Sequence, residues 1–492
     1  MTVHKYDLEV LLTTIKKAPH LIGALVGLLV VASHYYWLGI PRFFYGDDYL
    51  LFQASRTENG YASSILGSLN DVGSGKWRPL FTFLVSIMLK MFGNNYFAFF
   101  LINLLLLGVI ATLCGKILTE HSKLNSLQIG LISSSIPISR FAWYGRISPY
   151  GIMELGAIIC SLIFIIFFFR AQRNGSTVSW YLSGLMALCA TMFHERYLVL
   201  LGSSLLVALY CSIKKKSRIP IDPWLVYTTI YLFLKVNVLK LDIWQGGGEV
   251  PLRSSKGAWI LEHFLVALKA VVGLSDGRVI QFDVTGYVRE SSLSIVALFY
   301  PVAIVLFAVL IRERFSLTTA RTEGNLEEHK FQSSIFLVAT VGIILLIPAS
   351  TVVSRIEGRW LFGSEILLTL FLLLLADISH PNGRHVVSIL ISGICLLNVI
   401  SLRTLSKYEN PVRSTNRIIE FAQRENKSHP DRYLFINDPE NRTTQIQWQL
   451  AYGGVFSQFE NSLRGVIFYD SNCTERCIKL NLKSVKTIEI EN

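Results

Sequence analysis

The sequence predicts an all-α protein that crosses a membrane many times and carries a small soluble α/β domain at its C-terminal end. Hydrophobic residues make up 52% of the 492 positions and charged residues only 16%, with a mean hydropathy of +0.46. A soluble protein carries about 25% charged residues. This chain has too few charges to cover a water-facing surface, which excludes an ordinary soluble enzyme, a disordered chain and a nucleic-acid-binding domain.

Apolar runs recur along residues 1–402, and these define the predicted membrane domain. A spanning helix needs about 20 mostly apolar residues, and about eleven runs approach this length. These runs are 21–39, 97–115, 124–139, 150–169, 178–192, 197–212, 223–239, 292–311, 333–350, 360–376 and 386–402. The first run is followed by Gly39-Ile40-Pro41-Arg42 rather than by a small-residue cleavage site, so we expect a retained anchor.

The positions of Lys and Arg predict the orientation. Basic residues favour cytoplasmic loops, and Lys16 and Lys17 precede the first run. If the N-terminus is cytoplasmic, every cytoplasmic loop is basic, which accounts for the net charge of +12 without a nucleic-acid partner. The cytoplasmic loops contain Lys116, Lys123, Arg170, Arg173, Lys214, Lys215, Lys216, Arg218, Arg312, Arg314, Arg321 and Arg384. An odd number of spans then places residues 403–492, an α/β domain of soluble composition, in the periplasm of a bacterium whose inner (cytoplasmic) membrane holds the chain.

Ionisable residues are rare at the centres of the runs and collect at their predicted outer ends. Those on the outer side are Asp47, Asp48, Arg78, Arg140, Arg146, Glu154, His194, Glu195, Arg196, Arg355, Glu357 and Arg359. Transporters place such groups near the middle of the bilayer, where only Lys235 comes close. Carboxylates and arginines on one face of a helical bundle favour a membrane-bound substrate that carries a phosphate.

Asp47 and Asp48 lie in the first outer loop, residues 40–96, within an aromatic segment that ends at Tyr49. Adjacent carboxylates can supply a general base and an electrostatic or metal-binding partner, and aromatic rings stack on sugars. The alternative is a solvated turn with interfacial aromatic residues. In the same loop, Trp77-Arg78-Pro79-Leu80 opens about 14 apolar residues, too few to span, which predicts an amphipathic surface helix. A second outer loop, 241–291, is long enough to suggest function.

Two further outer segments carry charge. His194-Glu195-Arg196 lies between two runs, where a tight charge-paired hairpin is the alternative to a functional role. Arg355, Glu357, Arg359 and Trp360 lead into the run 360–376. Guanidinium groups form bidentate hydrogen bonds to phosphate oxygens, whereas simple interfacial anchoring explains one arginine more easily than two.

Taken together, these motifs resemble the polytopic glycosyltransferases of the C fold (GT-C) over roughly residues 20–400. The match consists of Gly46-Asp47-Asp48-Tyr49 after the first run, Arg78-Pro79-Leu80 before the surface helix, His194-Glu195-Arg196, and Glu357-Gly358-Arg359-Trp360. Many relatives have Lys-Glu where this chain has His194-Glu195. In overall form the chain resembles the O-antigen glucosyltransferases of serotype-converting phages and their hosts.

The resemblance implies transfer of a sugar, expected to be glucose, from undecaprenyl phosphate to lipopolysaccharide O-antigen by inverting direct displacement on the periplasmic face. It implies catalytic roles for Asp47, Asp48 and Glu195, and binding of the donor phosphate by Arg78, Arg355 and Arg359. The expected substrate-binding residues are Tyr49, Trp77, His194, Arg196, Glu357 and Trp360. We expect no cofactor, although the Asp pair with Glu195 has the chemistry for a divalent ion. The rival hypotheses are a transporter or flippase of lipid-linked saccharide and a structural envelope subunit.

Overall fold

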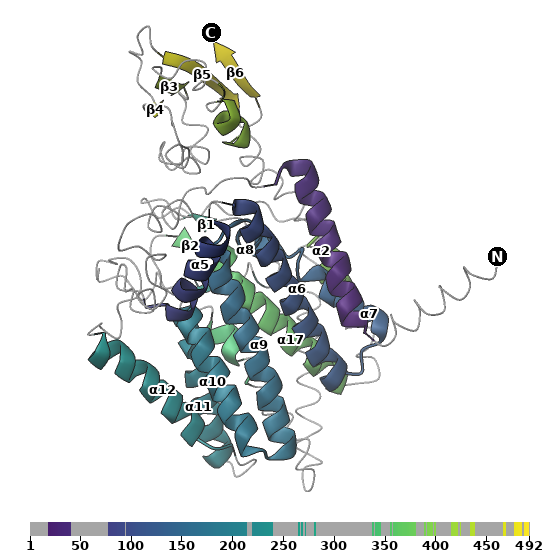
Figure 1. Cartoon of the computed structure of the whole chain (residues 1–492). Coiled ribbons are helices and arrows are strands. Elements are labelled where there is room, and N and C mark those ends of the chain that lie inside the picture. The colour runs from purple at the N-terminus through teal and green to yellow at the C-terminus, as the bar shows by residue number, and fades with distance from the viewer. Residues whose placement is uncertain are drawn as a thin grey trace, which may run out of the picture.

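The computed structural model describes residues 18–40, 77–93, 95–213 and 219–239, and parts of the chain beyond them. These parts are stretches within 264–281, 337–345, 355–379, 388–399 and 415–424, and strands within 433–437, 466–468, 477–484 and 487–491. The described chain is mostly helical, with the helices packed side by side in a bundle (Figure 1).

Three described helices are long and apolar enough to cross a membrane: α2 (Pro19–Leu38), α6 (Tyr96–His121) and α9 (Gly151–Asn174). Helix α2 keeps Leu21, Leu25 and Leu29 between 52% and 60% exposed. Leucines on an unpartnered helix face suit contact with lipid tails. The described helices therefore fit a membrane-embedded protein, and the expected total of about eleven spans remains a prediction.

Shorter helices complete the bundle. They are α7 (Ser126–Ser135), α10 (Thr177–Phe193), α11 (Leu198–Ile213), α12 (Asp222–Phe233) and α17 (Phe362–Ser379). Local sequence explains several of their ends. Asn125 and Gln128 form a capping box at the start of α7, and Ser176 caps α10. Helix α9 stops at Gly175, whose φ of +64° suits a residue without a side chain.

Close approach of α2 and α7 depends on glycine. A Cβ at Gly23 would collide with the carbonyl of Gly130, and one at Gly27 with that of Ser134. Positions 23 and 27 thus meet 130 and 134, so the two helices run in the same direction. Helix α6 runs the opposite way, because its Gly108 faces Leu28 and its later Gly115 faces the earlier His20 of α2. These directions fit a chain that crosses a membrane back and forth.

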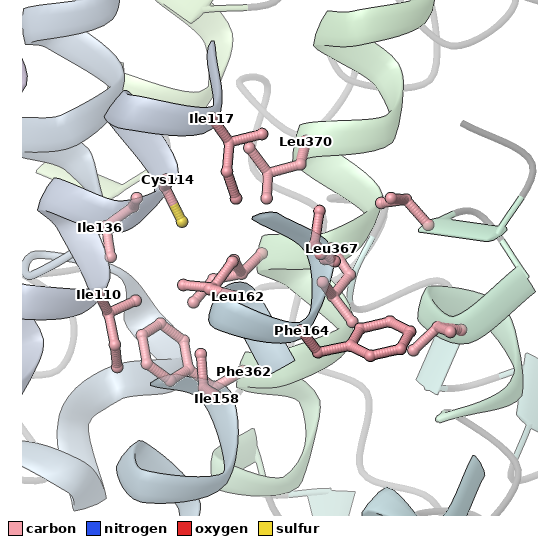
Figure 2. Close-up of a cluster of buried hydrophobic side chains, with 14 of the residues drawn as sticks. Ile110, Cys114, Ile117, Ile136, Ile158, Leu162, Phe164, Phe362, Leu367 and Leu370 are labelled. Carbon is pink, nitrogen blue, oxygen red and sulfur yellow. The ribbon is translucent and has the colours of Figure 1, made fainter. Parts of the chain in front are cut away.

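The hydrophobic core lies between α6, α9 and α17 (Figure 2). Its residues include Ile110, Cys114, Ile117, Ile136, Ile158, Leu162, Phe164, Phe362, Leu367 and Leu370. Helix α17 is far from α6 and α9 in sequence, yet its apolar side chains complete the same core. This packing brings the residues just before α17 beside the ends of the earlier helices.

The surface helix expected after Arg78 corresponds to α5 (Pro79–Phe92). Proline is favoured at the first helical position because its missing N–H needs no partner there, and Gly93 ends the helix with a φ of +56°. Phe81, Val85 and Leu89 are buried at helical spacing. Helix α5 packs against α10 and α9, so Arg78 is held near the end of α10.

The C-terminal region contains a four-stranded sheet with the order β4-β3-β5-β6. Its strands are β3 (Tyr433–Asn437), β4 (Val466–Phe468), β5 (Cys477–Ser484) and β6 (Thr487–Glu491). Strand β3 is parallel to β4 and β5, and β6 is antiparallel to β5. A separate antiparallel pair joins β1 (Ile280–Gln281) to β2 (Arg355–Ile356). An extracytoplasmic domain over residues 403–492 remains a prediction, because most of those residues lie outside the described part.

Candidate active site

The segment His194-Glu195-Arg196 forms the turn between α10 and α11. Helix α10 ends at Phe193, and a 3₁₀ turn, η3 (Glu195–Tyr197), leads into α11. The backbone N–H of Arg196 lies 3.4 Å from His194 Nδ1, so the His194 ring folds back over the turn. His194 and Arg196 are buried, so this turn presents its charged side chains to the protein rather than to solvent.

Glu195 is paired with Arg78. The Arg78 Nε and Nη2 atoms donate to the two carboxylate oxygens of Glu195 at 2.6 Å each. This bidentate geometry is the strongest form of arginine–carboxylate contact. Arg78 lies at the N-terminal boundary of α5, so the pair ties the start of α5 to the turn after α10. The two side chains are 15% and 17% exposed, more than the other ion pair of the site.

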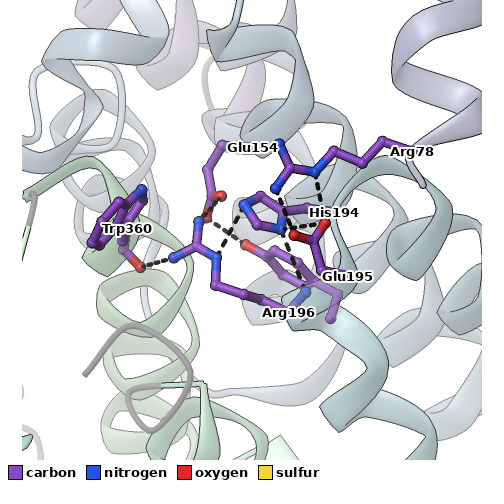
Figure 3. Close-up of polar contacts among 7 residues, drawn as sticks. Arg78, Glu154, His194, Glu195, Arg196 and Trp360 are labelled. Atoms are coloured by element: carbon purple, nitrogen blue, oxygen red, sulfur yellow. Dashed lines mark hydrogen bonds and ion pairs between the residues drawn. The ribbon is translucent and has the colours of Figure 1, made fainter. Parts of the chain in front are cut away.

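Arg196 is held by three different partners (Figure 3). Its Nη2 donates to Glu154 Oε2 at 2.7 Å, its Nη1 donates to the backbone oxygen of Trp360 at 3.3 Å, and its Nε donates to His194 Nε2 at 3.1 Å. The guanidinium also lies 5.7 Å from the centre of the Trp360 ring. Each nitrogen of Arg196 therefore has a partner within the chain.

Glu154 completes this second ion pair from the first turn of α9, where the helix dipole favours a carboxylate. Its other oxygen, Oε1, accepts a hydrogen bond from the Tyr197 hydroxyl at 2.8 Å. The start of α17 lies against both residues, because a Cβ at Gly363 would contact Tyr197 Oη and lie 3.5 Å from Glu154 Oε1. Glu154 thus connects α9, the α10–α11 turn and α17.

The electrostatics of the turn keep His194 neutral and Glu195 ionised. Burial lowers the pKa of His194 to about 3, with help from the nearby charges of Arg196 and Arg78 and against the opposing charge of Glu195. Burial raises the pKa of Glu195, but the charge of Arg78 and the hydrogen bonds from Arg78, with the neighbouring His194, outweigh it and leave that pKa well below the usual value. Glu195 is therefore a weak proton acceptor at neutral pH.

A second charged group lies at the start of α17. Arg140 and Arg146 belong to the short helical turns η2 (Arg140–Ala142) and α8 (Trp143–Ile147), and both are buried. Arg146 Nη2 donates to the Ser139 backbone oxygen at 2.7 Å. Ser139 Oγ donates to Glu365, which also interacts electrostatically with Arg140. Within the described residues, Arg146 Nε and Nη1 have no hydrogen-bond partner.

Buried charge is confined to one region of the described structure. Its buried charged and histidine side chains are Arg140, Arg146, Glu154, His194, Arg196, Lys235 and Glu365. Lys235 joins this region because it interacts electrostatically with Glu195. It lies in η4 (Leu234–Val238), a π-helical turn that extends α12 and is a frequent feature of functional sites. One turn earlier, Tyr231 stacks on Trp77 with ring centres 5.7 Å apart.

The structure brings together several of the residues expected from the sequence, namely Trp77, Arg78, His194, Glu195, Arg196 and Trp360. Asp47, Asp48, Tyr49 and Glu357 lie outside the described residues. Arg355 and Arg359 are placed by backbone only, in β2 and in the 3₁₀ turn η6 (Gly358–Leu361). Among the described residues, no group of three or more His, Cys, Asp and Glu side chains has the arrangement of a metal site.

Sequence reasoning assigned no role to Glu154, Tyr197, Lys235 or Glu365. Glu365 could have been singled out from the sequence, because it is the single charged residue of the apolar run 360–376. Lys235 is likewise the single charged residue of the run 223–239. An isolated charge in a long apolar run is costly to bury unless a partner from another segment neutralises it.

The fold and site define a helical protein with membrane-length apolar helices and a buried network of arginines, glutamates and a histidine at their ends. No protein-family model matches the chain, and no curated protein matches its sequence.

Proposed function

We propose that this protein is an integral membrane glycosyltransferase that transfers a sugar, expected to be glucose, from undecaprenyl phosphate to lipopolysaccharide O-antigen. The observation that carries the proposal is a cluster of buried arginines at the helix ends. Among the described residues, the cations of the region are Arg78, Arg140, Arg146, Arg196 and Lys235, and its carboxylates are Glu154, Glu195 and Glu365. Arg146 keeps two guanidinium nitrogens without a hydrogen-bond partner among these residues. Unsatisfied donors on a buried cation are unfavourable, so an anionic ligand suits this place.

The side chains around the site suit the phosphate, the lipid chain and the sugar of a lipid-phosphate donor. Arg78 and Arg196 are engaged by glutamates, whereas two nitrogens of Arg146 have no partner among the described residues. Arg146 is therefore the preferred candidate for the donor phosphate, beside Arg355 and Arg359, which the sequence motifs suggest. The apolar helices beside them suit a polyprenyl chain, and the stacked Trp77 and Tyr231 rings offer an aromatic surface near the Arg78–Glu195 pair.

The position of the charges favours an enzyme over a transporter. Glu154 and Glu365 lie in the first turns of their helices, and His194 to Arg196 lie between helices. Lys235 belongs to the last turn of its helix. A transport pathway would place ionisable groups along the middle of the spans.

The proposed reaction is a direct displacement at the anomeric carbon. The acceptor hydroxyl attacks this carbon, the bond to the phosphate oxygen breaks, and the phosphate leaves on the polyprenol with its charge stabilised by arginine. Asp47 or Asp48 accepts the proton of the hydroxyl. Glu195 is a poor choice for that role because Arg78 holds it ionised with a low pKa. In this proposal Glu195 positions Arg78 rather than acting as the base.

The proposal places the N-terminus in the cytoplasm, the site at the periplasmic face of the inner membrane, and residues 403–492 in the periplasm. The loop 241–291 and the C-terminal region would then present polar surface to the polymer acceptor. Sugar nucleotides are confined to the cytoplasm, so a lipid carrier must deliver the sugar to this side.

The test is transfer of radiolabel by membranes that contain the protein. Membranes are incubated with radiolabelled undecaprenyl-phosphate glucose and lipopolysaccharide, and the expected result is label in the polysaccharide. Ser183→Ala is a matched control, because Ser183 makes a buried hydrogen bond between α10 and α9 away from the charged network. Label that crosses the bilayer without joining the polymer would identify a flippase instead. No transfer with any polyprenyl-phosphate hexose would refute the proposal.

A further inference from the structure

We infer that His194 is a positioning residue that joins the Arg78–Glu195 and Arg196–Glu154 ion pairs into one network and thereby fixes the starts of α5 and α17 around the site. The inference rests on the proposed function for its kinetic consequence. The structural part of the inference is that one tautomer of His194 bridges the two ion pairs. It can be tested without an activity assay.

The hydrogen bonds around His194 assign its tautomer. The Arg196 Nε–H donates to His194 Nε2 at 3.1 Å, so Nε2 carries no proton. A neutral imidazole then carries its proton on Nδ1, and Nδ1 lies 3.4 Å from Glu195 Oε2. The backbone N–H of Arg196 also approaches Nδ1 at 3.4 Å. The charged guanidinium at the shorter distance makes the stronger bond, which favours the tautomer that donates toward Glu195.

Among the residues that the structure describes, the charges that act on His194 belong to the network. Arg196 and Arg78 disfavour a positive imidazole, and Glu195 favours it. Glu154 faces the far side of Arg196 and neutralises it. Burial adds to the effect of the two arginines, so His194 stays neutral and keeps both a donor and an acceptor.

A lysine at this position has only donors. It could bind Glu195 but would repel Arg196 instead of accepting its hydrogen bond. The His194-Glu195-Arg196 sequence of this chain therefore supports a bridge that Lys-Glu-Arg would not. His194 and Arg196 are two residues apart, so the bridge depends on the tight turn between α10 and α11.

The network connects two segments that follow candidate catalytic or binding residues along the chain. Arg78 follows the loop that contains Asp47 and Asp48, and it begins α5. The Trp360 carbonyl, which accepts from Arg196 Nη1, lies just after Arg355 and Arg359. A displacement of about 1 Å at a reacting centre can cost about 10²-fold in rate. Loss of the bridge should therefore lower kcat more than it raises KM for the donor.

Two substitutions separate the halves of the bridge. His194→Asn keeps a donor near the Nδ1 position for Glu195, and His194→Gln keeps an acceptor near the Nε2 position for Arg196. We expect each to lower kcat about tenfold or more, with KM for undecaprenyl-phosphate glucose changed less than about threefold. The Ser183→Ala control should retain wild-type kinetics. If both variants keep wild-type kcat, His194 is not a positioning residue for transfer.

The tautomer is measured on the full-length protein in lipid nanodiscs with ¹⁵N-labelled histidine. The His194 signals are assigned by their absence from the His194→Gln spectrum. We expect a protonated Nδ1 and an unprotonated Nε2 that do not change between pH 8 and pH 5. An Nε2–H tautomer or an imidazolium would overturn the inference. If wild-type membranes transfer no sugar, the proposed function fails, whereas this measurement still decides the role of His194 as a bridge.

Discussion

At the scale of single residues, the site is organised by neutralisation of buried arginines. Arg78 and Arg196 each have a glutamate partner from a different part of the chain, 117 and 42 residues away. Removing one member of such a pair leaves an unpaired charge, which costs more than the pair itself contributes. Among the described residues, Arg146 keeps two guanidinium nitrogens without a hydrogen-bond partner, which makes it a candidate for the proposed phosphate.

The low pKa of Glu195 predicts how the pH dependence of stability changes in Glu195→Gln. A carboxylate with a lowered pKa stabilises the folded state above its unfolded pKa of about 4.3 and loses this contribution as the pH falls further toward its folded pKa. The wild type should therefore have a higher melting temperature than Glu195→Gln by a constant amount between pH 8 and pH 5. The difference should shrink only below about pH 4.3. Thermal unfolding in detergent measures it, and a difference already vanishing at pH 6 would contradict the ion pair.

The proposed base predicts the behaviour of the Asp47 and Asp48 variants. Asn has nearly the shape of Asp but cannot accept the proton, and a general base contributes about 10²–10⁴-fold to rate. We expect Asp47→Asn or Asp48→Asn to abolish transfer and the other to have a smaller effect. Donor binding should survive in the inactive variant, because the arginines are unchanged. If both losses are severe and chelators inhibit the wild type, the pair binds a metal. Losses below about threefold in both would show that neither residue is the base.

At the scale of elements, the short turns matter more than the long helices. The α10–α11 turn, the start of α5 and the first turn of α9 supply the two ion pairs, and η6, just before α17, supplies the Trp360 carbonyl that Arg196 contacts. Each turn is set by packing of the helices that it joins. Elsewhere in the bundle, the close contact of α2 with α7 depends on glycines at the points of approach.

The packing of α2 against α7 predicts different results for two glycine-to-alanine substitutions. Gly23→Ala places a methyl group against the Gly130 backbone, which cannot move aside as a side chain can. Such overpacking costs about 1–3 kcal/mol. Gly202→Ala in α11 meets no atom within 4 Å and should be neutral or stabilising. Thermal unfolding of the purified variants measures the contrast, and equal melting temperatures would show that α2 does not pack on α7 in this way.

At the scale of the whole molecule, the described helices run in directions consistent with back-and-forth crossing. Gln128, Leu131 and Ser135 contact Ser388, Cys395 and Asn398 in the same order, so residues 388–399 run parallel to α7. The expected topology gives both segments the same direction, from inside to outside. If both segments cross the membrane, this agreement requires an odd number of crossings between them, and the expected total remains a prediction.

The topology predicts the outcome of a reporter fusion. Alkaline phosphatase is active only after export, so a fusion after residue 410 should be active if the C-terminal region is periplasmic. A fluorescent reporter at the same position should be dark. The opposite pattern would reverse the orientation and place the proposed site on the cytoplasmic side, away from a periplasmic acceptor.

The sequence alone determined the mostly helical, membrane-like class and the approximate positions of several helices. Hydropathy, helix caps and turn residues are properties of the local sequence. The apolar runs 21–39 and 150–169 therefore predicted the positions of α2 and α9 closely. Motif resemblance selected Arg78, His194, Glu195 and Arg196 but gave them separate substrate-directed roles. Only the tertiary structure decided that Glu195 neutralises Arg78, that His194 links Arg196 to Glu195, and that Glu365 reaches Ser139 across 226 residues. These partnerships depend on which helix ends meet in space, and that is decided by packing of apolar side chains across the bundle.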